Sequence, residues 1–376
     1  MKSRVLLSNS HLSGKEKIYI QEAIESNELT YGNNLNVFQD SLESYLGNDK
    51  KIVALSSGTS AIHLALIMAG VKHGDEVICQ SFTFSASANP ITYQGAIPVF
   101  VDSEKDTWNM CPIHLEKAIK HRISLGKKPK AIILVHLYGM PAKIDEVLAL
   151  AKKYEIALIE DAAEALGSSY KGQKCGTFGD FGILSFNGNK IITTSGGGAL
   201  VCKNDEDKKK AIFLATQARD EAVHYEHSHI GYNYRMSNIV AGIGRGQMEV
   251  LDKHVALRQE MNNFYRNLFK EVKGVQVLQE LKKGIISNHW LSCVVINEQE
   301  TGFSREDLRL ALLKDNIESR PLWKPMHLQP IFVDSAFYGD GFSEELFKKG
   351  LCLPSGSNLT EVEKDRVKVV IKKMIG

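Results

Sequence analysis

Short apolar segments alternate with amphipathic segments through the first half of the chain. Seven apolar runs of five or six residues are the candidate strands: 51–55, 76–80, 97–102, 131–136, 156–161, 182–186 and 198–202. Runs of this length and composition are typical of strands buried on both faces. Between them, segments such as 114–123 and 144–154 carry apolar residues at helical spacing. The pattern predicts an α/β fold, with a mostly parallel seven-stranded sheet and helices on both of its faces.

The pattern changes after residue 247, where a long helical pattern covers 248–272. A weak strand at 289–296 follows, and then two helices at 304–316 and 360–374. The second of these helices begins with Thr360 and Glu363, three residues apart, which is the spacing of a capping box. We therefore expect two domains: a large domain of residues 1–250 and a smaller C-terminal α+β domain of residues 251–376.

Composition and charge exclude several classes of protein. Hydrophobic residues make up 43% of the 376 residues and charged residues 24%, which is typical of a globular protein and not of a disordered one. The 46 Lys and Arg nearly balance the 44 Asp and Glu, so we expect no nucleic-acid or membrane partner. No apolar run is long enough to span a bilayer, and the N-terminal one, 5–7, is too short for a signal peptide. We therefore expect a cytoplasmic protein.

The six cysteines are scattered along the chain. They form no CxxC motif, and no histidine cluster has the spacing of metal ligands. We therefore expect no metal site and no disulfide framework, with most of the cysteines reduced and buried.

Three segments at the ends of predicted strands carry residues suited to chemistry. Gly58 and Thr59 lie in a turn that opens a helix after strand 51–55, where N–H groups and hydroxyls suit a phosphate, or where the turn is an ordinary capped one. Asp161 ends strand 156–161, and it either faces the ligand crevice of the sheet or starts a helix. Lys190 follows strand 182–186 in a Gly-rich loop, either as a solvent-facing side chain or as an amine for imine chemistry.

The three segments occur in order along one α/β domain. Together they match the needs of pyridoxal 5'-phosphate, which has a phosphate to anchor, a ring nitrogen to keep protonated and an aldehyde that binds an amine. This combination predicts a pyridoxal phosphate enzyme, although each segment alone has an ordinary structural interpretation.

At this point a family resemblance can be stated. The chain resembles the fold-type I sugar aminotransferases of the DegT/StrS type over essentially its whole length. The segments that carry the resemblance are ALSSGTSAIHLAL, SFTFSASANP, PVFVD, HLYGMPAKID, IEDAAEALGS, SFNGNKIITTSGGGAL and GYNYRMSN, in the order of the family. Among these enzymes it is most similar to those of the bacillosamine pathway, through RPLWKPMH at 320–327 and LCLPSG at 351–356.

The resemblance implies roles for individual residues. Lys190 would form the imine with the cofactor and Asp161 would hold its pyridine nitrogen, because a carboxylate favours the protonated ring. The other cofactor contacts implied are the phosphate ligands Gly58, Thr59 and Ser185, the stacking side chain Phe84, and Asn233, which would reach the phosphate in the neighbouring subunit of a homodimer.

One residue departs from the family pattern. The position after EDAA is often Gln or His, but here it is Glu164. An ionised carboxylate beside the cofactor's phenolate oxygen would be repelled, so Glu164 is expected either to be protonated or to face the substrate.

The resemblance also implies the reaction. The expected substrate is a UDP-linked 4-keto-6-deoxy-N-acetylhexosamine, which is aminated at carbon 4 with L-glutamate as the amino donor. The candidate substrate ligands are Arg320, His327, Arg235 and Arg219, since a guanidinium makes paired hydrogen bonds with a diphosphate.

Several alternatives remain beside this interpretation. The sugar could be GDP- or dTDP-linked, and amination could occur at carbon 3. Related sugar dehydratases replace the lysine with His, so Lys190 argues against them. A regulatory protein on the same fold would need a partner module for which the chain has no spare length, and an NAD dehydrogenase would need the GxGxxG motif that is missing.

Overall fold

The fold is built on one large sheet in a computed structural model that describes residues 2–47 and 49–376. The sheet has the order β1-β9-β8-β5-β4-β2-β3-β14. Its strands are β1 (Lys51–Leu55), β2 (Glu76–Gln80), β3 (Ile97–Val101), β4 (Ala131–Val135), β5 (Ala157–Asp161), β8 (Phe181–Ser185), β9 (Gly198–Cys202) and β14 (Phe337–Tyr338). All strands run parallel except β9, which is antiparallel to both of its neighbours.

The seven predicted strands are therefore confirmed, and an eighth joins the edge of the sheet. Strand β14 pairs with β3 in parallel, and it comes from the C-terminal part of the chain. It has only two residues, which is too short to give a hydrophobic period of its own.

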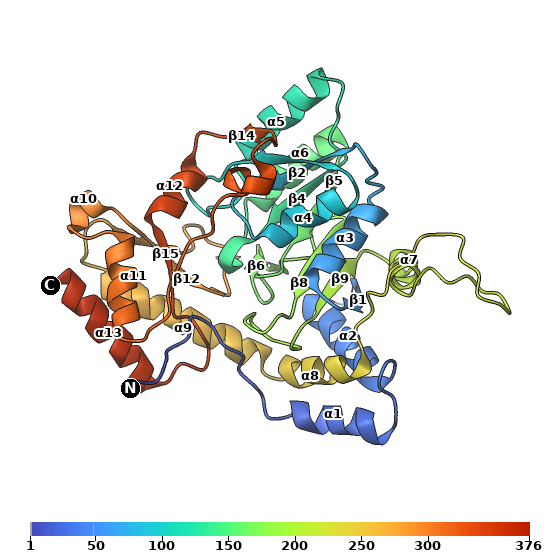
Figure 1. The fold of residues 1–376 in the computed structure, drawn as a ribbon, viewed down its shortest axis with the longest axis horizontal. Coiled ribbons are helices and arrows are strands. Elements are labelled where there is room, and N and C mark those ends of the chain that lie inside the picture. The colour runs from blue at the N-terminus through green and yellow to red at the C-terminus, as the bar shows by residue number, and fades with distance from the viewer. Residues whose placement is uncertain (1, 48) are drawn as a thin grey trace.

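Helices cover both faces of this sheet, as Figure 1 shows. The helices α3 (Gly58–Met68), α4 (Ser85–Tyr93) and α7 (Asp205–Ala215) share one core with side chains such as Val77 and Ile133. On the other face, α5 (Pro112–Ser124) and α6 (Ile144–Tyr154) pack on the alternate side chains, such as Ile78 and Ile132. Alternation of side chains along each strand thus gives the sheet two apolar faces, and both are covered.

Three further helices pack together beside the large sheet. The helices α1 (Glu16–Glu25) and α2 (Asn33–Leu46) both pack on α8 (Asn238–Met248). After α8 the chain enters α9 (Leu251–Phe269), which leads to a second sheet (Figure 1). Among the described residues, no helix combines the length and the apolar character needed to cross a membrane.

The second sheet is antiparallel and has the order β10-β12-β15-β13. Its strands are β10 (Val275–Val277), β12 (Ser292–Ile296), β15 (Gly350–Leu353) and β13 (Arg320–Pro321). It shares a core with α9, α11 (Arg305–Lys314) and α13 (Glu361–Ile375), and the predicted capping box of Thr360 is present. The remaining short elements are α10 (Glu298–Thr301), α12 (Phe342–Lys349) and a small sheet of β11 (Ile285–Ile286), β6 (Ser169–Tyr170) and β7 (Gln173–Lys174).

The N-terminal segment packs with this second sheet before it reaches α1. Val5 forms a bridge with Ile317 and is fully buried in the C-terminal core. In Figure 1 the dark blue segment begins beside α13 and runs under α9 to α1. The predicted boundary at residue 250 falls between α8 and α9, and the division of the chain into two domains stays a prediction.

A buried carboxylate joins the C-terminal region to the large sheet. Asp102 follows β3, and its two oxygens accept hydrogen bonds from the backbone N–H groups of residues 340–343 at the start of α12. Burial alone would raise the pKa of Asp102, but hydrogen bonds, from Ser343 first, outweigh burial and lower it. The ionised form therefore anchors this part of the chain beside the edge strand β14.

Candidate active site

A cavity of about 670 Å³ opens at the carboxyl ends of β1, β5 and β8. Parallel strands bring these ends to one edge of the sheet, where ligands of α/β proteins bind. The second sheet and the segment before β12 close the cavity from the other side. The structure brings most of the predicted site residues to this cavity: Gly58, Thr59, Phe84, Asp161, Glu164, Ser185, Lys190 and Arg320.

The turn between β1 and α3 forms one end of the cavity. Ser57 caps α3 through a hydrogen bond from the N–H of Ser60 (3.0 Å), so Gly58 and Thr59 lie in the first helical turn. The first N–H groups of a helix have no partner within it, and they favour anions. A Cβ atom at Gly58 would lie 3.2 Å from Cβ of Ser185, so a larger residue would crowd the place where a phosphate fits.

Asp161 lies at the end of β5, where it forms the floor of the cavity. Its side chain is held in place, because Oδ2 accepts a hydrogen bond from Oγ of Ser87 (2.7 Å) and Oδ1 accepts one from the N–H of Ala163 (3.1 Å). Only 4% of the residue is exposed. A buried carboxylate that keeps a free direction toward the cavity suits a protonated ring nitrogen as its partner.

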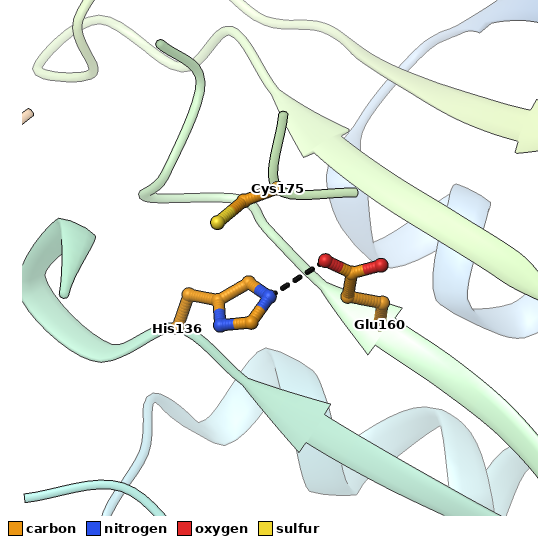
Figure 2. A group of neighbouring side chains, drawn as sticks. All are labelled: His136, Glu160 and Cys175. Atoms are coloured by element: carbon orange, nitrogen blue, oxygen red, sulfur yellow. Dashed lines mark hydrogen bonds and ion pairs between the residues drawn. The ribbon is translucent and has the colours of Figure 1, made fainter. Parts of the chain in front are cut away.

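The preceding carboxylate, Glu160, points away from the cavity. Figure 2 shows it with His136 and Cys175, a group that has the donor atoms of a metal site. However, Nδ1 of His136 accepts the N–H of Ala142, so Nε2 carries the proton and donates it to Oε1 of Glu160 (2.7 Å).

The remaining sites of Glu160 are also used. Its oxygens accept the N–H groups of Gly176, Phe178 and Gly179, and burial raises the pKa of the Cys175 thiol well above its usual value. The cluster is thus a hydrogen-bond network that fixes the strand end next to Asp161, and the ring nitrogens of His136 and both carboxylate oxygens of Glu160 already take part in hydrogen bonds.

Lys190 reaches the cavity from a loop without regular structure. Its Nζ lies 3.5 Å from Oε1 of Glu164 and 4.1 Å from the centre of the Trp290 ring. The side chain is 14% exposed, so the amine faces the cavity and not bulk solvent. This placement removes the interpretation of Lys190 as an ordinary surface lysine.

Glu164 is the least ordinary group of the cavity. Its Oε2 accepts the N–H of Tyr138 (2.6 Å), while Oε1 faces Lys190. Burial raises the pKa of Glu164 to about 7, although the Lys190 amine and the Tyr138 N–H lower it and Asp161 raises it further. The carboxyl group therefore changes charge near neutral pH, which decides how it interacts with any acidic oxygen placed beside it.

An aromatic wall lies beside Lys190, with Tyr138 buried behind the rings that line the cavity. Of its four rings, the family resemblance singled out only Phe84. Trp290, Tyr138 and Trp323 lie with their ring centres 5.2–6.4 Å apart, and Phe84 adds a fourth ring 5.3 Å from Trp323. Phe84 is 56% exposed at the mouth of the cavity. Such rings offer flat apolar surfaces for a cofactor or a nucleotide base.

Further residues that the sequence patterns missed line the opposite side. Leu7 and Ser8 come from the N-terminal segment, and Glu318 precedes β13. The only signal for Trp323 was its place in RPLWKPMH, and no periodic pattern connects residues 7 and 8 with Asp161 or Lys190, which lie more than 150 residues further along the chain.

The remaining predicted residues lie outside the cavity of a single chain. His327 bonds to Oγ of Ser81 (2.7 Å) and stacks on Phe337, and Arg235 donates to Gln39 (3.2 Å). Arg219 and Asn233, like Arg235, belong to segment 216–235. Arg219 lies over the ring of Tyr225, and Asn233 is exposed. The ligand roles of these four residues stay predictions.

Comparison with known proteins places this geometry in a family. The model of the DegT/DnrJ/EryC1/StrS aminotransferase family matches residues 11–374. EpsN of Bacillus subtilis (strain 168), named a pyridoxal phosphate-dependent aminotransferase, is 51% identical over 98% of this chain and 95% of its own. GDP-perosamine synthase of Escherichia coli O157:H7 is 36% identical over 93% and 92%. UDP-4-amino-4,6-dideoxy-N-acetyl-beta-L-altrosamine transaminase of Campylobacter jejuni (strain 81-176) is 34% identical over 71% and 70%.

Solved structures agree with the family model. A DegT DnrJ EryC1 StrS aminotransferase from Brucella abortus has a TM-score of 0.90 at 29% identity and covers 96% of both chains. The sugar aminotransferase Spr1654 from Streptococcus pneumoniae, in its pyridoxal phosphate form, has a TM-score of 0.89 at 26% identity and covers 100% of both chains. The predicted aminotransferase fold and the predicted cofactor are therefore confirmed.

The raised pKa of Glu164 predicts a pH-dependent stability of the cofactor-free protein. A carboxyl group whose folded pKa lies above its unfolded value of about 4.5 binds more protons when folded. Stability is therefore lost as the pH rises from about 4.5 to about 7, by on the order of 3 kcal/mol. Glu164→Gln cannot ionise, so we expect it to unfold at a higher temperature than the wild type at about pH 8, with little difference at about pH 5.

The measurement is thermal unfolding across this pH range. Glu271→Gln is the matched control, because Glu271 is exposed and should leave the pH dependence unchanged. Parallel curves for wild type and Glu164→Gln would contradict the assignment of this titration to Glu164.

Proposed function

The chain belongs to the DegT/DnrJ/EryC1/StrS aminotransferase family, and from this premise we propose that it aminates carbon 4 of a UDP-linked 4-keto-6-deoxy-N-acetylhexosamine, with L-glutamate as the amino donor. Its class is that of the pyridoxal phosphate-dependent sugar aminotransferases. The observation that carries the proposal is the convergence of Lys190, Asp161 and the turn at Gly58 on one cavity. The product would be an amino sugar for a surface glycan or for protein glycosylation.

The residues of the cavity fit the cofactor at each of its ends. When bound, pyridoxal phosphate supplies an aldehyde that holds an amine and a protonated ring that withdraws electrons from the reacting carbon. The first turn of α3, at Gly58 and Thr59, and the hydroxyl of Ser185 would hold the phosphate. Asp161 would accept a hydrogen bond from the protonated ring nitrogen, and Phe84 would offer the ring a flat apolar surface.

Lys190 performs the proton transfers. Its Nζ would hold the aldehyde of the cofactor. Once the amino donor is bound in its place, the free amine would act as the base that takes a proton from the α-carbon of L-glutamate and as the acid that returns one, and it would serve in the same way for the keto-sugar. Glu164, 3.5 Å away, is the neighbouring group that can share a proton with this amine.

Arg320 is the candidate ligand of the diphosphate. It lies at the mouth of the cavity with 65% of its side chain exposed, and its Nη2 donates to Oε1 of Glu318 (2.8 Å). The planar guanidinium can make paired hydrogen bonds with a diphosphate. His327, Arg235 and Arg219 lie outside the cavity of a single chain. In our proposal they contact the substrate either after moving toward the cavity or from the second chain of a dimer.

A second chain fits the exposed part of segment 216–235. Residues 219–230 extend beyond α7, away from the body of the protein (Figure 1), whereas residues 232–235 are bonded to it. Val223, Tyr225 and Ile230 in the extended part are exposed by 77% or more, which is unfavourable for apolar side chains in water. In a homodimer these side chains would be covered, and Asn233 would approach the phosphate site of the partner subunit.

The UDP-linked sugar is supported by the relative from Campylobacter jejuni, whose name specifies such a substrate. A GDP-linked keto-sugar is the second candidate, because GDP-perosamine synthases of three organisms are 34–36% identical over nearly the whole chain.

The first test concerns Lys190. Borohydride reduction of the holoenzyme should fix the cofactor on the peptide that contains SFNGNK, and Lys190→Ala should abolish both labelling and transamination without loss of the fold. Asp161→Asn should fold and keep covalent labelling, but lose most activity because an amide no longer favours a protonated ring. Mass spectrometry of the reduced peptides reads the result, and label on another lysine would overturn the assignment.

The second test concerns the shared site. Lys190→Ala and Asn233→Ala are each expected to be inactive, and a mixture under subunit exchange should regain activity, because mixed dimers contain one site free of both changes. Tyr154→Phe, which lies far from segment 216–235, serves as the control partner with unchanged activity. A mixture that regains nothing, or an active monomer on a sizing column, would contradict the homodimer.

The third test concerns the sugar. UDP-, GDP- and dTDP-linked 4-keto-sugars are offered with L-glutamate, and products are identified by mass spectrometry and NMR. We expect amination at carbon 4 of the UDP-linked acetamido sugar, since a site that hydrogen-bonds a polar group strongly rejects analogues without it. Equal or better use of a GDP-linked sugar would favour the second candidate, and amination at carbon 3 would overturn the regiochemistry.

A further inference from the structure

The loop that carries Lys190 is held by side chains from distant parts of the chain. Residues 187–190 form no helix or strand. Nevertheless, the backbone carbonyls of residues 188–191 each accept a hydrogen bond from a side chain outside the loop. The donors come from the N-terminal segment, from α9 and from the segment before β12, and they are Ser8, Ser10, His254, Arg258 and Trp290.

Arg258 is the centre of this arrangement. It is 1% exposed, and one nitrogen, Nη2, donates both to the carbonyl of Lys190 (3.4 Å) and to Oγ of Ser8 (3.0 Å). The other, Nη1, donates to the carbonyls of Trp290 and Ser355. A single side chain thus links the lysine loop, the N-terminal segment and one end of the central strand pair of the second sheet, where β12 begins and β15 ends.

The electrostatics of Arg258 are unusual for a structural arginine. Within the part of the chain that the structure describes, no carboxylate lies within ion-pair distance of its guanidinium, which is bound only to carbonyl and hydroxyl oxygens. Burial lowers the pKa of Arg258 to about 9. An unpaired buried cation is costly, and an apolar side chain of similar length would fill the space more favourably. The cost indicates that the hydrogen bonds themselves have a use.

We propose that Arg258 is a positioning residue, whose guanidinium fixes the backbone of Lys190 so that Nζ stays aimed into the cavity. The inference rests on the proposed function in one respect, that Lys190 is the residue which binds the cofactor. Ser8 completes this hydrogen-bond network, because its hydroxyl accepts a hydrogen bond from Arg258 and donates one to the carbonyl of Asn189 (2.9 Å). The N-terminal segment is then part of the active site, although it lies far from Lys190 in the sequence.

The physical reason lies in the loop itself. A loop outside helices and strands keeps many conformations, even with the turn hydrogen bond from the N–H of Lys190 to the carbonyl of Asn187 (3.0 Å), and a lysine adds four further rotatable bonds. A displacement of about 1 Å at the reacting amine costs roughly a hundredfold in rate. Arginine suits the task better than lysine, because its planar fork reaches acceptors in several directions at once while an ammonium is a single point.

The experiment compares Arg258→Met, Arg258→Lys and Arg258→Ala with Arg266→Met, a control on the exposed face of the same helix. Cofactor-free protein is mixed with pyridoxal phosphate. We record the rate at which the yellow absorbance appears and the visible circular dichroism of the bound chromophore. We expect capture at least about tenfold slower and a changed dichroism for Arg258→Met, with kcat lowered more than KM is raised. Arg266→Met should behave like the wild type.

Two further variants separate positioning from packing. Arg258→Ala leaves a hole, and millimolar guanidinium should restore part of the capture rate, whereas Arg258→Met, whose hole is filled, should not respond. Arg258→Lys keeps the charge with fewer directed donors, so its capture rate should stay well below the wild type. If Arg258→Met does not fold, these two variants decide the outcome.

The outcome that overturns the inference is a folded Arg258→Met or Arg258→Lys with wild-type capture rate and dichroism. Failure of the proposed function is distinguishable, because in that case Lys190→Ala would still capture the cofactor covalently. The state of Arg258 would then have no bearing on the site.

Discussion

An amine has to be kept beside one buried carboxyl group in a cavity whose floor carries a second one, Asp161. The Nζ of Lys190, 3.5 Å from Glu164, is the group that satisfies this constraint. Each of the three groups would be expensive to bury alone, and their charges compensate one another only when their positions are fixed. Much of the surrounding structure can be understood as the means of fixing them.

A different set of hydrogen bonds holds each of these groups in place. Asp161 is held by Ser87 and by the network of Glu160 behind it, so that two successive carboxylates of one strand serve opposite sides of the sheet. Alternation along a strand makes this possible, since adjacent side chains point to different faces. Glu164 is held by a backbone N–H at Tyr138, whose ring also belongs to the aromatic wall. Tyr138 therefore links the carboxyl group of Glu164 to the aromatic wall.

The cavity is completed by parts that lie far apart along the chain. The large sheet supplies the floor and the phosphate turn, the second sheet supplies Arg320 and the aromatic side, and the N-terminal segment lies against the lysine loop. Asp102 ties the C-terminal region to the edge of the large sheet through the start of α12. A change in the relative placement of these parts would alter the distance between Lys190 and the substrate side of the cavity, which couples stability to function.

The large sheet and the floor of the site could be predicted from the sequence. Runs of apolar residues with a clear period identify buried strands, and the residues after them, such as Gly58, Asp161 and Lys190, follow because parallel strands share one carboxyl edge. The surroundings of Glu164, the approach of Trp290 and Ser8 to the site, and the hydrogen bond from Arg258 to the carbonyl of Lys190 became visible only in the folded structure. Local patterns record periods of two and 3.6 residues along a segment. Contacts such as those of Lys190 with Arg258 and of Asn189 with Ser8 join residues 68 and 181 positions apart. They depend on how the two sheets and the N-terminal segment pack, and no local period encodes that packing.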